Sequence, residues 1–406
     1  MKKDVLFLCQ YFYPEENSSA TLPFDTACAL AQNGWTVDVL CGWPKEYSRA
    51  EQVRKTETVS GVCVCRLRYL QLSRAGKLGR LINFFSFTVA VLLHIGTMRK
   101  YRTVMVYSNP PILPLACVLA NALFGTQFVF VVYDVYPEIA EASGRIGPGG
   151  LISRFMRRLN HSVFHRAAKI VSLTDEMRDY LLQRRPELDA ARVTVIANWA
   201  HEEGAASPNL KNADGKLVVS YFGNLGICQD ADTLLDAMDI LRDDQNIRFL
   251  FAAHGSGKER VWQRVSAFQN VELFDYLTGE DFARVEALSD CGIVSLNRGL
   301  KGMCAPSKYY SYLCAGQAVV AVVDNDSYLM REICDESIGA SVVQGEGRKL
   351  AEQLRTMAAN PHETAQMGAR ARRLYEKQYS RASAMQKYRL LFKELLGSPQ
   401  NKESKE

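Results

Sequence analysis

Short apolar segments alternate with segments of helical periodicity along almost the whole chain, and this alternation is the strongest constraint on its fold. A strand followed by a helix and another strand favours parallel sheets built from β-α units. Between the first two strands, a helix over residues 22–32 is expected to end at Asn33-Gly34, a typical C-terminal signal. The first set of strands is expected at residues 5–9, 36–41, 104–107, 128–133, 170–173 and 193–196.

A second set of strands begins after residues 201–216, a polar segment that carries Gly, Pro, Asn and Asp. These strands are expected at residues 217–222, 248–253, 271–274, 292–295, 318–323 and 340–343. We therefore expect an α/β protein with two Rossmann-like, doubly wound parallel-sheet domains that face each other across a cleft. The predicted boundaries are 1–200 for the first domain, 201–216 for the linker and 217–381 for the second domain.

Composition excludes several classes of protein. The chain has 406 residues, of which 48% are hydrophobic and 23% charged, as in globular proteins with sizeable cores. Its 11 cysteines include no CxxC pair, which argues against a zinc or haem site and favours reduced cytosolic thiols. The net charge of +5 is compatible with an anionic partner but predicts no nucleic acid. The first residues predict a buried strand rather than a signal peptide, because Asp4 precedes the apolar run and Glu15-Glu16 follow it.

One segment, residues 81–98, has an apolar character that raises the question of a membrane. Three interpretations remain open: a buried core helix, an interfacial helix that is apolar on one side, and a transmembrane helix. The polar residues Asn83, Ser86 and His94 make the transmembrane interpretation the weakest of the three. Cations flank the segment, so residues 77–102 could face an anionic membrane surface; they are Lys77, Arg80, Arg99, Lys100 and Arg102.

In doubly wound sheets, ligands bind beyond the carboxyl ends of the strands, so binding residues are expected in the loops that follow the strands. After residues 217–222 come Gly223-Asn224 and, further along, Gln229, before a helix expected from about residue 231. This loop could hold an anion, or it could be an ordinary β-α turn. No GxGxxG pattern is present, so nicotinamide and flavin cofactors have no support. His254-Gly255 begin a loop that lacks the full phosphate-loop pattern of ATPases and kinases, and a lone histidine there is more often a surface residue.

The segment 305–327 carries the clearest signal. Ser307 is expected to be the N-cap of a helix about eight residues long that ends before Gly316. Lys308 then lies in the first turn, where a cation is electrostatically unfavourable unless an anion is bound. A diphosphate would satisfy both the helix N–H groups and the ammonium, with Lys301 and Gly302 just upstream. The alternative is that Lys308 extends to water.

In the first half, Asp134 and Glu138 follow the strand expected at 128–133, where an acid/base or hydroxyl-binding group would lie. The simpler alternative is that Asp134 caps a helix and Glu138 is solvated. The loop 10–21, which includes Glu16, Asn17, Ser18 and Ser19, is long enough to line the expected cleft.

Taken together, these residues resemble the bacterial family 4 glycosyltransferases of the GT-B fold, and within them the exopolysaccharide and O-antigen enzymes of the fucosamine-transferase type. The resemblance is carried by residues 11–40, SNPPILPLA at 108–116, YDVYPEIA at 133–140, VIANW at 195–199, YFGNLGICQDADTLL at 221–235 and PSKYYSYLCAGQAVVAVVD at 306–324. It implies metal-independent, retaining transfer of a sugar from a nucleotide diphosphate sugar, with a UDP-sugar the expected donor. It also implies a lipid-linked glycan acceptor, a cytoplasmic location at the inner face of the plasma membrane, and a last helix at 382–396 that packs back on the first domain.

The resemblance also implies roles for individual residues. Asp134 and Glu138 match an acidic motif that holds the acceptor or the transferred sugar, and they are the expected catalytic residues. The loop of Glu16, Asn17, Ser18 and Ser19 is expected on the acceptor side. The expected donor-binding residues are Gly223, Asn224, Gln229, His254, Gly255, Lys301, Gly302, Ser307, Lys308 and Tyr312.

Several positions depart from the family pattern. Asn224 and Gln229 stand where Arg and Lys are common, and Met303 and Ser311 where two glutamates are common. Most of the diphosphate's charge would therefore be carried by Lys308, Lys301, Asn224 and the helix N-termini. The identity of the donor sugar cannot be inferred from the family. Two alternative functions follow: a non-catalytic GT-B scaffold subunit, which the missing residues favour, and a nucleotide-sugar 2-epimerase, which shares the fold.

Overall fold

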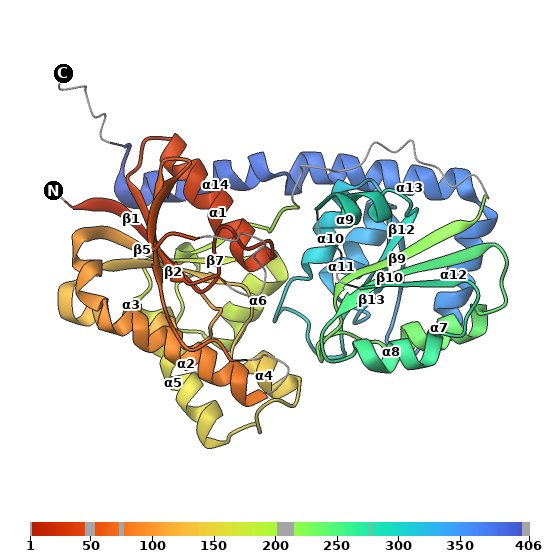
Figure 1. Ribbon diagram of the computed structural model, residues 1–406, viewed down its shortest axis with the longest axis horizontal. Helices are drawn as coiled ribbons and strands as arrows, with labels where there is room; N and C mark the ends of the chain where they lie inside the picture. The colour runs from red at the N-terminus through yellow and green to blue at the C-terminus, as the bar shows by residue number, and fades with distance from the viewer. Residues whose placement is uncertain are drawn as a thin grey trace. The chain divides into compact units, whose positions relative to one another are not determined.

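The computed structural model describes residues 2–44, 53–72, 77–200, 215–275, 277 and 279–399 (Figure 1). The chain divides into two compact units. Unit 1 comprises Met1–Ala197, Gly302–Ala305 and Ala384–Glu406, and unit 2 comprises Asn198–Lys301 and Pro306–Ser383. Most of the predicted linker, residues 201–214, lies outside the described residues.

Unit 1 contains an eight-stranded sheet in the order β3-β4-β2-β1-β5-β6-β7-β8. Neighbouring strands are parallel except for the edge pair of β3 and β4, which is antiparallel. This edge hairpin was not predicted, because β3 is a half-exposed strand with no apolar run. The strands are β1 (Lys3–Cys9), β2 (Val37–Gly42), β3 (Thr56–Val59), β4 (Val62–Leu67), β5 (Tyr101–Tyr107), β6 (Gln127–Val132), β7 (Lys169–Ser172) and β8 (Val193–Val195).

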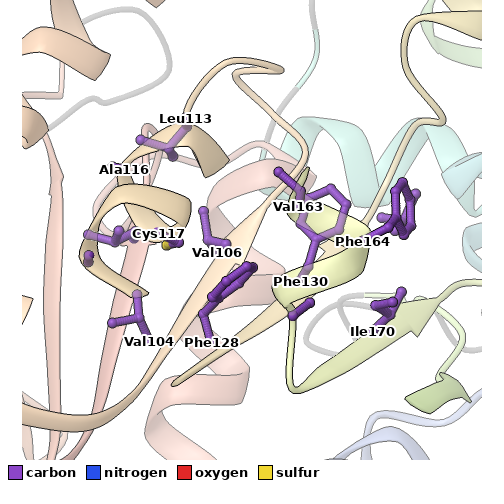
Figure 2. Packing of buried hydrophobic residues seen from close by; sticks show 14 of the residues in the cluster. Val104, Val106, Leu113, Ala116, Cys117, Phe128, Phe130, Val163, Phe164 and Ile170 are labelled. Atoms are coloured by element: carbon purple, nitrogen blue, oxygen red, sulfur yellow. The ribbon is translucent and has the colours of Figure 1, made fainter. Parts of the chain in front are cut away.

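The main core of unit 1 lies between this sheet and four helices, α2, α3, α5 and α6. Figure 2 shows the inner side of α3, with Ala116 and Cys117, and of α5, with Val163 and Phe164, packed on the apolar residues of β5, β6 and β7. The helices of unit 1 are α1 (Ser18–Gln32), α2 (Lys77–Leu93), α3 (Pro114–Phe124), α4 (Glu138–Ala142), α5 (Leu151–Arg166), α6 (Asp175–Arg184) and the larger part of α14 (Arg381–Leu396), with the 3-10 turns η1 (Ile95–Lys100) and η2 (Ala190–Arg192).

The segment 81–98 is an amphipathic helix followed by a 3-10 turn. Phe87 and Val91 are buried in the core, whereas Phe85 and Val89 on the same helix are exposed. Within the described residues, no helix combines the length and the apolar character needed to cross a membrane. Helix α2 buries one side in the core and presents an apolar stripe on the other.

Unit 2 contains a six-stranded, fully parallel sheet in the order β11-β10-β9-β12-β13-β14. The prediction of two doubly wound parallel sheets is thus confirmed. The elements are β9 (Leu217–Asn224), β10 (Ile247–His254), β11 (Val271–Phe274), β12 (Cys291–Ser295), β13 (Ala318–Val322), β14 (Gly339–Val342), α7 (Asp232–Leu241), α8 (Lys258–Val265), α9 (Gly279–Glu286), α10 (Ser307–Cys314), α11 (Tyr328–Asp335), α12 (Gly347–Ala359), α13 (Pro361–Leu374) and the π-helical turn η3 (Tyr375–Tyr379).

Candidate active site

In unit 2, the loops that follow β9 and β10 form one structure. The two strands pair in parallel, and Asn224 lies opposite His254 at their ends. Beyond the strands, the Leu225 N–H donates to the His254 carbonyl at 2.7 Å, and the Gly257 N–H donates to the Leu225 carbonyl at 2.8 Å. In the sequence these two loops lie about 30 residues apart and were predicted independently of each other. The pairing of β9 with β10 brings their predicted donor-binding residues together.

Two glycines make this close packing feasible. Gly223 and Gly255 have φ angles of +102° and +105°, a region that favours glycine. A Cβ at Gly255 would collide with the Asn224 side chain and come within 2.9 Å of the Leu225 carbonyl oxygen. A Cβ at Gly223 would lie 3.4 Å from Cε of Lys308, so the missing side chain leaves room for that lysine.

Lys308 is half-buried, and its ammonium contacts groups of unit 2. Its Nζ donates to the Asn224 carbonyl oxygen at 2.7 Å and to the Tyr221 hydroxyl at 3.2 Å, and it lies 4.5 Å from the centre of the Tyr221 ring. Burial lowers the pKa of Lys308 to about 7. The pKa of His254 is also lowered, chiefly by burial and then by the charges of Lys308 and Lys258. Burial destabilises the charged form of a lysine, and an anion that binds beside it restores this electrostatic stabilisation.

The head of α10 differs in one detail from its prediction. The N-cap is Pro306, no side chain caps the helix, and Ser307 is the first helical residue. The prediction of Ser307 as N-cap was therefore wrong by one position. Gly316, with φ of +69°, follows the end of the helix as predicted. Among the described residues no side chain caps the first turn, and the Tyr309 N–H donates to the Pro306 carbonyl at 3.2 Å. The N–H groups of Ser307 and Lys308 are therefore the ones that a ligand could use.

Three other predicted donor-binding residues have partners within unit 2. The side chain of Gln229 accepts a hydrogen bond from the Gly226 N–H at 2.8 Å, which closes the loop after β9. Lys301 forms an ion pair with Asp326. Tyr312 is buried in the core, where its hydroxyl accepts from the Phe222 N–H at 3.1 Å. Gln229 thus stabilises the loop after β9, and Tyr312 stabilises β9 itself. The charge of Lys301 is compensated by Asp326.

In unit 1, Asp134 follows β6 and lies beside a second segment of chain. The Ser108 hydroxyl accepts from the N–H groups of Tyr133 and Asp134, at 3.0 and 3.1 Å. Burial raises the pKa of Asp134 to about 6, although the charge of Arg145 acts in the opposite direction. Helix α4 begins at Glu138 with Pro137 as its N-cap, so the alternative in which Asp134 caps a helix is wrong.

Glu138 is neither solvated nor free. Its carboxylate forms an ion pair with Arg185 at 2.9 Å, and both side chains are about nine-tenths buried. The Arg185 guanidinium also lies 4.5 Å from the centre of the Phe164 ring. The second carboxylate oxygen of Glu138 and Nη1 of Arg185 have no hydrogen-bond partner among the described residues. No local pattern in the sequence indicates Arg185, which lies 47 residues away at the C-cap of α6.

The residues Gly302–Ala305, which precede α10, belong to unit 1. The Met303 carbonyl accepts from the Val135 N–H at 2.8 Å, and Cys304 forms an antiparallel bridge with Asp134. The side chain of Met303, at a position where the family often has glutamate, packs against the core of unit 1. The predicted donor-binding residue Gly302 thus lies against α6 of unit 1, in a segment attached to the acidic motif.

We expect Gly302→Ala to destabilise this attachment. Gly302 has φ of +72°, and a Cβ would lie 2.8 Å from Cβ of Tyr180. Gly299→Ala is the matched control, because Gly299 has φ of +80° and open space around the missing Cβ. Both variants pay the backbone strain, about 1 kcal/mol, but only Gly302→Ala adds a clash, about 1–3 kcal/mol more. Urea unfolding measures both losses, and equal losses would exclude close packing at Gly302.

The acceptor-side loop is shorter than predicted, because α1 begins at Ser18 and not near residue 22. Ser18 and Ser19 are therefore helical, Asn17 is the N-cap, and Glu16 is exposed. Both atoms of the Asn17 side-chain amide are buried without a hydrogen-bond partner among the described residues.

Arg66 on β4 supports this loop and was not predicted. Its fully buried guanidinium donates to the Tyr13 carbonyl at 2.8 Å and forms an ion pair with Glu57 at 2.6 Å.

No cluster of three or more His, Cys, Asp or Glu side chains that could hold a metal ion occurs within the described ranges.

Residues 24–199 match the sequence model of the glycosyl transferase 4-like domain. The chain is 26% identical over 274 residues to the probable glycosyltransferase WbjE of Pseudomonas aeruginosa, covering 64% of this chain and 66% of WbjE. It is 24% identical over 283 residues to WcaI of Escherichia coli K12, a putative colanic acid biosynthesis glycosyl transferase, covering 65% and 68% of the two chains. The chain thus aligns with about two thirds of the length of each relative.

The fold has solved counterparts. The crystal structure of HepE from Anabaena, in complex with UDP and glucose, is similar with a TM-score of 0.67 at 14% identity, covering 97% of this chain and 100% of HepE. At this identity the likeness concerns the fold. Residues 24–199 thus match a glycosyl transferase 4-like domain, and the chain as a whole has the GT-B fold.

Proposed function

We propose that this protein transfers a sugar from a nucleotide diphosphate sugar, with UDP as the nucleotide, to a lipid-linked glycan in the synthesis of a cell-surface polysaccharide. The observation that carries the proposal is Lys308, an ammonium lowered in pKa by burial, at the open end of α10 and against the loop after β9. The UDP bound by HepE and the colanic acid assignment of WcaI support the choice of donor and pathway class.

Unit 2 would supply the donor site. When the bond between sugar and diphosphate breaks, negative charge develops on the leaving phosphate, and preorganised donors stabilise it. Lys308 and the uncapped N–H groups of Ser307 and Lys308 at the start of α10 are suited to this role. We propose a retaining, metal-independent reaction, in which the leaving phosphate oxygen accepts the proton of the acceptor hydroxyl. No protein nucleophile is needed for that route.

Unit 1 would supply the acceptor side, with different roles for the two acidic residues. Glu138 is neutralised by Arg185, so its role is to hold the end of β6 and the start of α4 in place. Asp134 has no ion pair with any described residue and a pKa near 6, so it can accept a hydrogen bond from a sugar hydroxyl. The unsatisfied amide of Asn17 is suited to a second hydroxyl.

A non-catalytic scaffold is the second candidate, because Met303 is packed against the core of unit 1 where the family often has a substrate-binding glutamate. The 2-epimerase alternative loses support, because the Arg185 ion pair leaves Glu138 poorly suited to proton abstraction.

A panel of nucleotide sugars separates these functions. With the matching donor and a lipid extract as acceptor source, we expect release of free nucleoside diphosphate that depends on the extract. Slow release without acceptor, by transfer to water, also supports a transferase. Isomerisation of the sugar would indicate an epimerase. Failure of every nucleotide sugar to bind, measured by calorimetry, would leave the scaffold.

We also propose that the protein acts on the cytoplasmic side of the plasma membrane, with residues 77–102 toward its anionic inner face. The exposed stripe of α2 supports this placement. Arg102 contributes less than the other cations of the segment, because it forms an ion pair with Asp4 at 3.2 Å.

A further inference from the structure

Exposed apolar side chains are concentrated in one part of unit 1. In the described residues, 15 large apolar side chains are exposed, and 10 of them lie on only three helices, α2, α3 and α5. On α2 their spacing of three or four positions forms a stripe along the helix. The 10 residues are Leu78, Leu81, Phe85, Val89 and Leu93 on α2, Leu119 and Leu123 on α3, and Leu151, Ile152 and Phe155 on α5.

These three helices cover the same face of the sheet. Their inner residues share one core, and α3 packs against both α2 and α5 (Figure 1). The outer residues of α2, α3 and α5 therefore belong to one surface, which we call the three-helix face. Leu151 and Phe155 place its far end on α5, outside the segment 77–102.

The charges of this region have one sign. Across α2, η1, α3 and α5, which comprise 50 residues, there are eight Lys and Arg and no Asp or Glu. The whole chain has a net charge of +5, so all its other residues together sum to −3. Half of the eight cations lie on α5, where Arg154 and Arg158 are exposed and have no ion-pair partner among the described residues.

We infer that the three-helix face docks on an anionic lipid bilayer, and that α5 supplies the cations at one end of it. Leucine and phenylalanine enter the interface between headgroups and acyl chains, while arginines bind the anionic headgroups. The four elements themselves contain no acidic residue, and this uniform sign of charge favours an anionic bilayer. An acidic residue that contacts α5, Glu141 of α4, is paired with Arg157 at 2.5 Å and leaves Arg154 and Arg158 uncompensated within the described residues. The use of such docking rests on the proposed lipid-linked acceptor, but the docking itself does not require that acceptor.

Co-sedimentation of the full chain with phosphatidylcholine vesicles, with and without phosphatidylglycerol, tests the inference. We expect binding only to the anionic vesicles, and weaker binding at higher salt. Arg154→Glu with Arg158→Glu should lower the partition coefficient by about tenfold or more. Leu151→Ser with Phe155→Ser should lower it by a similar factor, without changing the salt dependence.

A matched control lies on α14 of the same unit, where Arg389 and Leu390 are exposed. Arg389→Glu with Leu390→Ser should bind vesicles like the unchanged protein. Equal loss in the control and the α5 variants would overturn the inference, as would binding indifferent to lipid charge. It is also overturned if the protein ignores vesicles but self-associates through Leu151 and Phe155, because the face would then be a protein interface. Vesicle binding without any nucleotide-sugar turnover would keep the docking and refute the proposed function.

Discussion

Lys308→Met is expected to weaken binding of UDP by about 1.5–3 kcal/mol, the range measured for hydrogen bonds to charged groups. In the structure this ammonium is partly buried and held between the Tyr221 hydroxyl and the Asn224 carbonyl, with its pKa lowered to about 7 by burial. A diphosphate would return to it the charge stabilisation that burial removes. Calorimetric titration with UDP measures the loss.

The pH dependence of UDP binding gives a signature that a general structural defect would not reproduce. The bound diphosphate raises the pKa of Lys308, so above about pH 7 the unchanged protein must take up a proton to bind. Affinity should therefore fall as pH rises from 7 to 9, by up to about tenfold per pH unit. Over this range UDP itself stays ionised, since its last phosphate proton leaves near pH ~6. In Lys308→Met this slope should vanish.

Two other lysines of unit 2 provide controls. Lys349 forms an exposed ion pair with Glu346 at 3.3 Å, and Lys349→Met should leave UDP affinity unchanged. Lys301 is paired with Asp326, so Lys301→Met should cost less affinity than Lys308→Met. An unaltered affinity and an unaltered pH slope in Lys308→Met would remove Lys308 from the donor site.

Asp134→Asn should reduce the rate of sugar transfer by about 100-fold or more, the range for removal of an acid/base or hydroxyl-orienting group. The UDP affinity should not change, because Asp134 belongs to unit 1 and the proposed phosphate contacts to unit 2. Steady-state transfer assays combined with UDP titration separate the two effects. Loss of UDP affinity together with activity would contradict the proposed role.

The same substitution should stabilise the protein, and the sign follows from the raised pKa. Asp134 titrates at about 6 in the folded chain, against an ordinary value of 3.8. The folded state therefore binds the proton more tightly, and ionised Asp134 costs stability that is fully expressed above about pH 6 and absent below about pH 4. Asp134→Asn should raise the free energy of unfolding by about 2 kcal/mol at pH 8, with little gain at pH 4. Urea unfolding at the two values checks this.

The fold could be predicted because parallel strands buried on both faces appear as uninterrupted apolar runs. The same reasoning missed β3, which lies at the sheet edge and keeps polar, half-exposed residues. It also missed β4, in which the buried Val62 and Val64 alternate with half-buried cysteines. Lys308 could be predicted because a cation in the first turn of a helix conflicts with the helix dipole, and the conflict is visible in the sequence itself.

The partners of the site residues could not be predicted in the same way. Arg185 is one of many arginines in the sequence, and only the fold, in which α6 packs beside β7 and β8, places it on Glu138. Likewise, Tyr13 lies in the loop after β1, and β4 is separated from β1 by one strand, β2. This strand order brings Arg66 of β4 to the Tyr13 carbonyl. Such long-range pairs depend on topology and carry no local pattern. They decide which of two neighbouring carboxylates is neutralised.

The position of Gly302–Ala305 has a consequence for anyone who exchanges parts between this protein and its relatives. A chimera cut only near residue 200 would bring a foreign Gly302–Ala305 segment to this protein's Asp134, Val135 and Tyr180. An exchange that respects the contacts needs further junctions, on either side of residues 302–305 and before Ala384. Donor-specificity swaps designed with a single junction should therefore fold less well than those that return these four residues to the unit 1 parent.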